Sequence, residues 1–162
     1  MAVFAPNPTE KLDQELDTAR QLMTVLKEEQ SQLIKANIDS LEPLVGKKSA
    51  LIARMSELAK ARLTVLTQMG YPAEEASMQK WLDSPAAQSI KKAPIKKTWD
   101  ELRAIIRSSK ALNRTNGLLI STHMSRSQAA LQVLQGNQGG AQVYGRNGQT
   151  SVQTTSRSLV VG

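Results

Sequence analysis

The sequence predicts an all-α protein: an antiparallel bundle of three long helices and one short helix, with coiled-coil-like packing and a disordered C-terminal tail. Apolar residues recur at intervals of three and four over three long stretches, which is the spacing of one helix face. Aromatic residues make up only 3% of the chain, so aliphatic side chains on helices must supply the core. Gly, Ser, Thr and Gln dominate the end of the chain, which therefore cannot bury enough apolar surface to offset its ordering entropy.

These patterns divide the chain into three parts. We expect residues 1–8, which contain two prolines, to be disordered. Residues 9–134 carry the helical periodicity and should form the bundle domain. Residues 135–162 should form a flexible tail.

The first two long helices should form a hairpin. Helix one begins near Thr9, and its exposed face carries mixed charges that include Glu15. Residues 36–40 form a short break, in which Asp39 or Ser40 can cap the next helix. Helix two covers residues 41–69 and ends at Gly70. Because the break is so short, helix two must run back antiparallel along helix one.

Two basic residues, Lys48 and Arg62, lie on the apolar face of helix two. Each can extend its aliphatic stem across the apolar groove, or it can pair with a carboxylate on a neighbouring helix. The sequence leaves both alternatives open.

The third long helix should run from Thr98 to Leu134, with a length on the order of 55 Å. Thr98 and Glu101 have the spacing of a capping box at its start. Before it, residues 73–97 are irregular; they should contain a short helix over 73–82 anchored by Trp81, and their further path stays open.

Polar residues interrupt the apolar seam of this third helix. Asn113 falls on the heptad position of Trp99, and Asn116 falls on the partner position. Amides on a seam cost stability unless they find hydrogen bonds, but they can fix helix register. Gly117 costs about 1 kcal/mol against Ala in a helix interior, which predicts close approach of a neighbouring helix.

The sequence carries no recognisable catalytic, cofactor or metal site. There is no Cys, and the single histidine, His123, lies on the seam, where a structural role is expected. No basic region followed by an apolar run opens the chain, and no run of about 18 apolar residues occurs. We therefore expect a cytoplasmic protein that is not an enzyme, uses no small-molecule substrate and does not insert into membranes.

The net charge of +7 is unevenly distributed. Residues 1–70 contain nine basic and nine acidic residues, whereas residues 71–162 contain twelve basic and five acidic ones. A basic second half can attract nucleic acid or an acidic protein surface. The alternative is a solvated basic loop around Pro94, where much of this positive charge lies.

The stretch Leu112-Asn113-x-x-Asn116-Gly117-x-Leu119-Ile120, with Trp99 about two heptads earlier, resembles the FlgN-type flagellar export chaperones. The resemblance covers about residues 10–134. It extends to a pattern in the first two helices, formed by Glu29, Leu33, Asp39, Leu44, Lys48, Leu51, Leu58, Arg62, Leu66 and Gly70.

This resemblance implies a chaperone that binds the C-terminal helices of hook-filament junction (hook-associated) proteins, prevents their premature assembly and delivers them to the flagellar export gate. The implied client surface is the exposed side of the last helix: Leu118, Met124, Ala129, Leu131, Val133 and Leu134. Tyr144 and Gly145 resemble the segment linked to docking at the export gate. Secretion chaperones are often acidic, and the basic charge of this chain departs from that pattern.

Two other interpretations remain at this point. A basic helical protein that binds nucleic acid without sequence preference would explain the charge, but the basic residues are not interleaved with aromatic residues. A structural coiled-coil oligomer would explain the heptads, but the polar residues in the stripes and the hairpin argue against it.

Overall fold

A computed structural model describes residues 6–89, 92–139, 143–144 and 150–151. It confirms the all-α class, with three long helices, one short helix and helical-bundle packing. The chain divides into two compact units, Met1–Ile120 and Ser121–Gly162.

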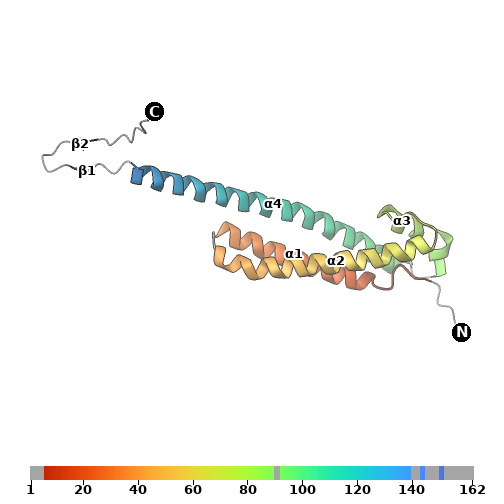
Figure 1. Cartoon of the computed structure of the whole chain (residues 1–162). Helices are drawn as coiled ribbons and strands as arrows, with labels where there is room; N and C mark the ends of the chain where they lie inside the picture. Colours follow the sequence, from red (N-terminus) through yellow and green to blue (C-terminus); the bar gives the residue numbers. More distant parts are fainter. Residues whose placement is uncertain (1–5, 90–91, 140–142, 145–149, 152–162) are drawn as a thin grey trace, which may run out of the picture. The chain divides into compact units, whose positions relative to one another are not determined.

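The N-terminal unit is built on a hairpin of α1 (Leu12–Ile34) and α2 (Leu41–Gln68), which lie side by side in Figure 1. The Asn7 side chain accepts hydrogen bonds from the backbone and hydroxyl of Thr9 and so turns the chain into α1. Between the helices lies the 3₁₀ helix η1 (Ile38–Ser40), and Ser40 precedes α2 without making a side-chain capping bond. The predicted cap is therefore wrong, because a 3₁₀ turn leads directly into α2.

The predicted end of α2 at a glycine is confirmed. Gly70 has a φ of +91°, which residues other than glycine rarely adopt. Its backbone N–H donates to the carbonyl of Thr67, and that of Tyr71 donates to the carbonyl of Leu66. These two bonds form a Schellman motif and satisfy carbonyls at the end of the helix.

The short helix α3 (Ala76–Leu82) and the 3₁₀ helix η2 (Pro85–Ser89) follow α2. Trp81 is 2% exposed, which confirms it as the anchor of this segment. Residues from α1, α2, α3, η2 and α4 together form the main core cluster: Leu12, Leu16, Ala19, Leu66, Met78, Trp81, Leu82, Ala87, Trp99 and Leu102.

The long helix α4 runs from Lys92 to Gly139, beyond both predicted ends. Its earlier start overturns the predicted capping box, because Thr98 lies inside the helix and donates its hydroxyl to the carbonyl of Pro94. Glu101 pairs with Arg20 of α1. Residues 135–139, which we expected to belong to the tail, are helical.

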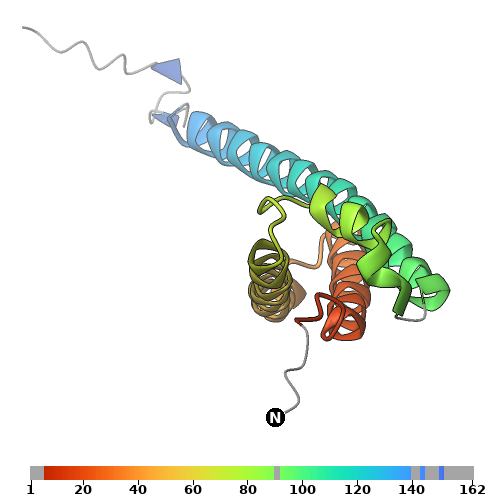
Figure 2. The ribbon, with the colours of Figure 1, turned by 90° about the vertical axis from the view of Figure 1, so that its right-hand side faces the viewer.

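Within the N-terminal unit, α4 runs parallel to α1 and antiparallel to α2. Contacts between α1 and α4 advance along both helices in the same direction, from Arg20 with Glu101 to Leu26 with Asn116. In Figure 2, α1 lies between α2 and the first part of α4.

The C-terminal unit contains the remainder of α4 and a minimal antiparallel pair of strands. Strands β1 (Val143–Tyr144) and β2 (Thr150–Ser151) pair Val143 with Ser151 and Tyr144 with Thr150. The sequence periodicity did not predict these strands. The rest of the expected tail lies outside the described residues, and so do residues 1–5 of the N-terminus that we expect to be disordered over 1–8. Pro8, within that range, is buried.

Candidate functional site

A polar cluster, which we call the Glu29 cluster, joins the three long helices: Glu29 and Asn116 are buried, Lys48 is half-buried and Asn113 is exposed. Glu29 of α1 is 0% exposed and accepts hydrogen bonds from Lys48 Nζ of α2 at 2.8 Å and from Asn116 Nδ2 of α4 at 2.9 Å. Asn116 Nδ2 also donates to the carbonyl of Leu26 at 2.9 Å, and Lys48 lies 3.4 Å from the side-chain oxygen of Asn113. Since the cluster needs one register of each helix, it fixes how α1, α2 and α4 align.

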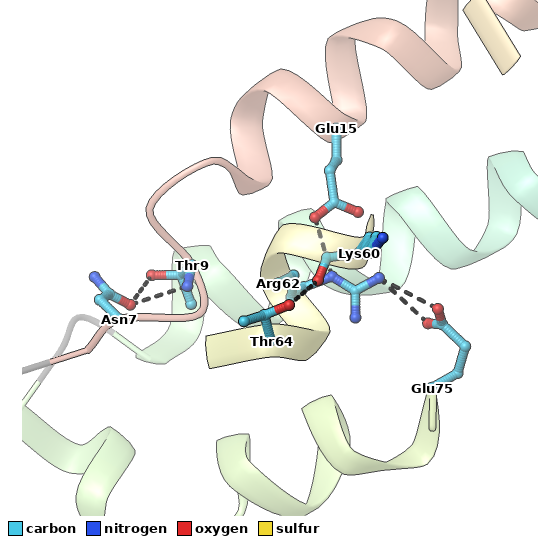
Figure 3. A network of polar contacts seen from close by, with 7 residues as sticks. All are labelled: Asn7, Thr9, Glu15, Lys60, Arg62, Thr64 and Glu75. Carbon is cyan, nitrogen blue, oxygen red and sulfur yellow. Dashed lines mark hydrogen bonds and ion pairs between the residues drawn. The ribbon is translucent and has the colours of Figure 1, made fainter. Parts of the chain in front are cut away.

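A second polar cluster, the Arg62 cluster, lies beside the core and is drawn in Figure 3. Arg62 Nε donates to Glu15 Oε1 at 3.0 Å, and both side chains are almost fully buried. The same guanidinium pairs at 3.3 Å with Glu75, which is largely exposed, and stacks over the ring of Trp99 at 4.7 Å. The cluster thus connects α1, α2 and α4 with the residue that precedes α3.

The Arg62 cluster shows how a carboxylate is tolerated inside the bundle. Burial raises the pKa of the Glu15 carboxyl above its ordinary value, while the charge and hydrogen bond of Arg62 oppose that rise. The nearby Glu75 carboxylate raises the pKa further, because two like charges disfavour each other. The ion pair with Arg62 therefore compensates part of the cost of burying Glu15.

These contacts settle the two alternatives for the basic residues of α2. Lys48 and Arg62 both pair with carboxylates of α1. The expectation that Glu15 belongs to the exposed face is wrong, since it is 1% exposed. A signal was present in the sequence: Glu15 lies three residues after Leu12 and four before Ala19, on the buried stripe.

The residues of the Asn-Gly motif have different environments. Asn116 is fully buried, Leu112, Leu119 and Ile120 are half-buried, and Asn113 is exposed. A Cβ atom at Gly117 would meet no atom within 4 Å, so the expected close approach of a neighbouring helix is wrong. The motif therefore acts in packing through Asn116 and its apolar neighbours.

The six residues that the resemblance implies for client binding are all exposed. Five are large hydrophobic side chains, and their exposed fractions range from 56% at Leu131 to 63% at Val133. At 3.6 residues per turn they do not share one face. Met124 and Leu131 lie one above the other, whereas Ala129 and Val133 lie on another side of α4.

Leu118 belongs to the N-terminal unit, and the other five residues belong to the C-terminal unit. Of the residues expected to dock at the export gate, Tyr144 lies in β1, and Gly145 lies outside the described residues.

In the described part of the chain, no three His, Asp or Glu side chains gather where a metal ion could bind. His123 is half-buried and takes part in an interaction. None of the described helices combines the length and the apolar character needed to cross a membrane.

Comparison with known proteins decides the family. The sequence profile described as FlgN protein matches residues 1–151. The chain belongs to the FlgN family. Membership in the FlgN family assigns it to the chaperones of flagellar assembly.

Two curated FlgN relatives match most of the chain. A flagella synthesis protein FlgN from Proteus mirabilis is 27% identical over 154 residues, which cover 93% of this chain and 91% of the relative. The flagella synthesis protein FlgN of Yersinia enterocolitica serotype O:8 is also 27% identical, over 139 residues that cover 85% and 84%. No solved structure matches the chain.

Proposed function

We propose that this protein is a cytoplasmic chaperone of type III flagellar export that binds the C-terminal helices of hook-associated proteins. It prevents their premature assembly and delivers them to the export gate. Beside membership in the FlgN family, one observation supports the proposal. The segment of α4 from Met124 to Leu134 is helical and exposed at every residue, and it includes several large apolar side chains.

Such a segment is costly in water and suited to a partner helix. An amphipathic helix places its apolar face against apolar side chains of a groove or of another helix. Exposed apolar residues lie on more than one side of α4 here, as Met124 and Val133 show. A helix that is apolar on several sides is normally covered on several sides, so we expect the client to cover more than one face of α4.

Delivery to the export gate is the second part of the proposal. Tyr144 is its candidate contact, with Gly145 as the residue that follows. Tyrosine combines a large apolar ring with a polar hydroxyl and is favoured in protein interfaces.

Calorimetric titration with a peptide from the C-terminal helix of a hook-associated protein of the same organism tests client binding. We expect saturable 1:1 binding to the unaltered full chain. Leu131→Glu and Leu134→Glu should each weaken the affinity at least about tenfold, because each charge would be buried against an apolar partner. Gln132→Glu adds the same charge at an exposed polar position and is the matched control. Equal affinity of all four proteins would place the client elsewhere, and absence of binding would contradict the proposed clients.

A further inference from the structure

The N-terminal unit has an apolar groove that is separate from the proposed client segment. Its volume is about 520 Å³, and α1 forms its floor with Ala19, Leu22 and Leu26. Ile52 and Met55 of α2 line one wall, and Ile106 of α4 lines the other. Ile52 is 47% exposed, which leaves a large apolar side chain open to solvent in the groove.

The groove also contains a polar atom without a partner. Ser109 lines it from α4 and is 6% exposed. Its hydroxyl oxygen is buried and makes no hydrogen bond within the described residues. A buried hydroxyl without a partner is costly, so Ser109 gains a hydrogen bond when its side chain rotates toward a donor or an acceptor of an occupant.

The α4 side of the groove is basic. Arg103, Arg107, Lys110 and Arg114 follow one another at intervals of four, three and four residues, so they lie on one side of the helix. All four are exposed, and none has an ion pair with another described residue. Lys110 lines the groove itself, and no acidic side chain does so among the described residues.

The length of the groove defines what it can hold. Its α2 wall extends from Ile52 to Ala59, and its α4 wall extends from Ile106 to Asn113. Each wall therefore covers eight residues, whose seven steps of about 1.5 Å add up to about 10 Å and two helical turns. Two turns accommodate apolar anchors at positions i, i+3 or i+4, and i+7 of a docked helix.

We propose that this groove binds an amphipathic α-helix of a partner protein that carries carboxylates along one edge of its apolar face. The apolar anchors fill the space between Ile52 and Ile106, and the carboxylates pair with Arg107, Lys110 and Arg114. Charge complementarity fixes the direction and register of the bound helix and raises its association rate. Nucleic acid would use the basic residues but not the apolar walls, and the stripe has no aromatic side chains for base stacking.

This inference does not depend on the proposed client segment, because every residue that lines the groove lies between Ala19 and Asn113. It applies to any partner with a helix of this chemistry. The result of a test with a peptide designed from the groove alone is therefore independent of the result of the client-binding test.

The probe is a fluorescein-labelled amphipathic peptide of about 20 residues, with leucines at the anchor positions and glutamates along one edge. Fluorescence anisotropy with the full chain should show saturable binding that weakens as salt is added. The same peptide with lysines in place of the glutamates should bind at least about tenfold more weakly, since like charges repel. Equal affinity for both peptides, or no saturation at about 100 μM, would overturn the proposal.

Variants of the chain test the place of binding. Ile52→Glu puts a charge into the groove, and Ala59→Leu fills it without adding charge; each should weaken binding about tenfold. Lys110→Glu should weaken binding and reduce its salt dependence, whereas Lys97→Glu makes the same charge change at an exposed residue outside the groove and should have little effect. Circular dichroism shows whether each variant keeps its helices.

Three results would contradict the proposal. If Ile52→Glu and Ala59→Leu bind the acidic peptide as well as the unaltered chain does, the peptide binds elsewhere and the proposal is wrong. If sedimentation shows a concentration-dependent dimer that Ile52→Glu abolishes, the groove is filled by a second copy of this chain. Weakened peptide binding by Leu134→Glu would place the site on the client segment instead.

Discussion

Replacing Lys48 with Met removes the cation that pairs with the buried carboxylate of Glu29. The side chains of Lys48 and Glu29 are 17% and 1% exposed, so the pair is largely shielded from water. Removal of one partner from a buried ion pair costs about 3–5 kcal/mol, because the other charge stays buried without compensation. Lys48 retains some solvent contact and Asn116 still donates to Glu29, so we expect the lower end, about 3 kcal/mol.

The assay is urea denaturation followed by far-UV circular dichroism, with a thermal scan beside it. For a chain of this size about 3 kcal/mol corresponds to a fall of about 6–12 °C in the thermal midpoint. Lys47→Met is the matched control, because Lys47 is the exposed neighbour on the same helix, and it should change stability by less than about 0.5 kcal/mol. A double-mutant cycle with Glu29→Gln should give a coupling of more than about 1 kcal/mol. Equal losses for Lys48→Met and Lys47→Met would refute the reasoning.

Two further substitutions test other parts of the N-terminal unit. Because the pKa of Glu15 is raised, the folded protein binds the proton of this carboxyl more tightly than the unfolded chain does. The unaltered chain should therefore lose stability relative to Glu15→Gln as the pH rises from the ordinary pKa of 4.5 through the raised pKa. Urea midpoints of both proteins over that pH range measure the difference, and a difference that grows in favour of Glu15 with pH would contradict the sign. Gly117→Ala should raise the free energy of unfolding by about 0.5–1 kcal/mol, because the site is helical and open; a loss in the same assay would show that Gly117 needs its freedom.

Local patterns were enough to predict most of the fold. The hairpin, the glycine end of α2 and the anchoring role of Trp81 follow from spacing and turn chemistry, which are properties of neighbouring residues. The start of α4 did not follow from them. Thr98 and Glu101 have capping-box spacing, but Glu101 pairs with Arg20 across the bundle, and such a contact is absent from any local window.

The partners within the Glu29 and Arg62 clusters could not be predicted from the sequence either. Lys48 and Arg62 were visible as charges on an apolar face, but the choice between solvent and a carboxylate depends on which residues of α1 lie opposite. The charge of Glu15 predicts an exposed side chain, but its position on the apolar stripe of α1 buries it. The groove beside Ile52 arises from the mutual placement of three helices, which no single periodic pattern contains.

The position of the two tryptophans has a practical consequence. The chain contains two, and both Trp81 and Trp99 lie buried in the same core cluster of the N-terminal unit. Intrinsic tryptophan fluorescence therefore reports the integrity of that unit and carries no signal from the helical residues after Ile120, whereas circular dichroism registers the helix of both. Unfolding curves that coincide by the two methods would mean that the exposed end of α4 melts together with the core. If the dichroism falls first, that end unravels as a separate cooperative element before the rest of the molecule.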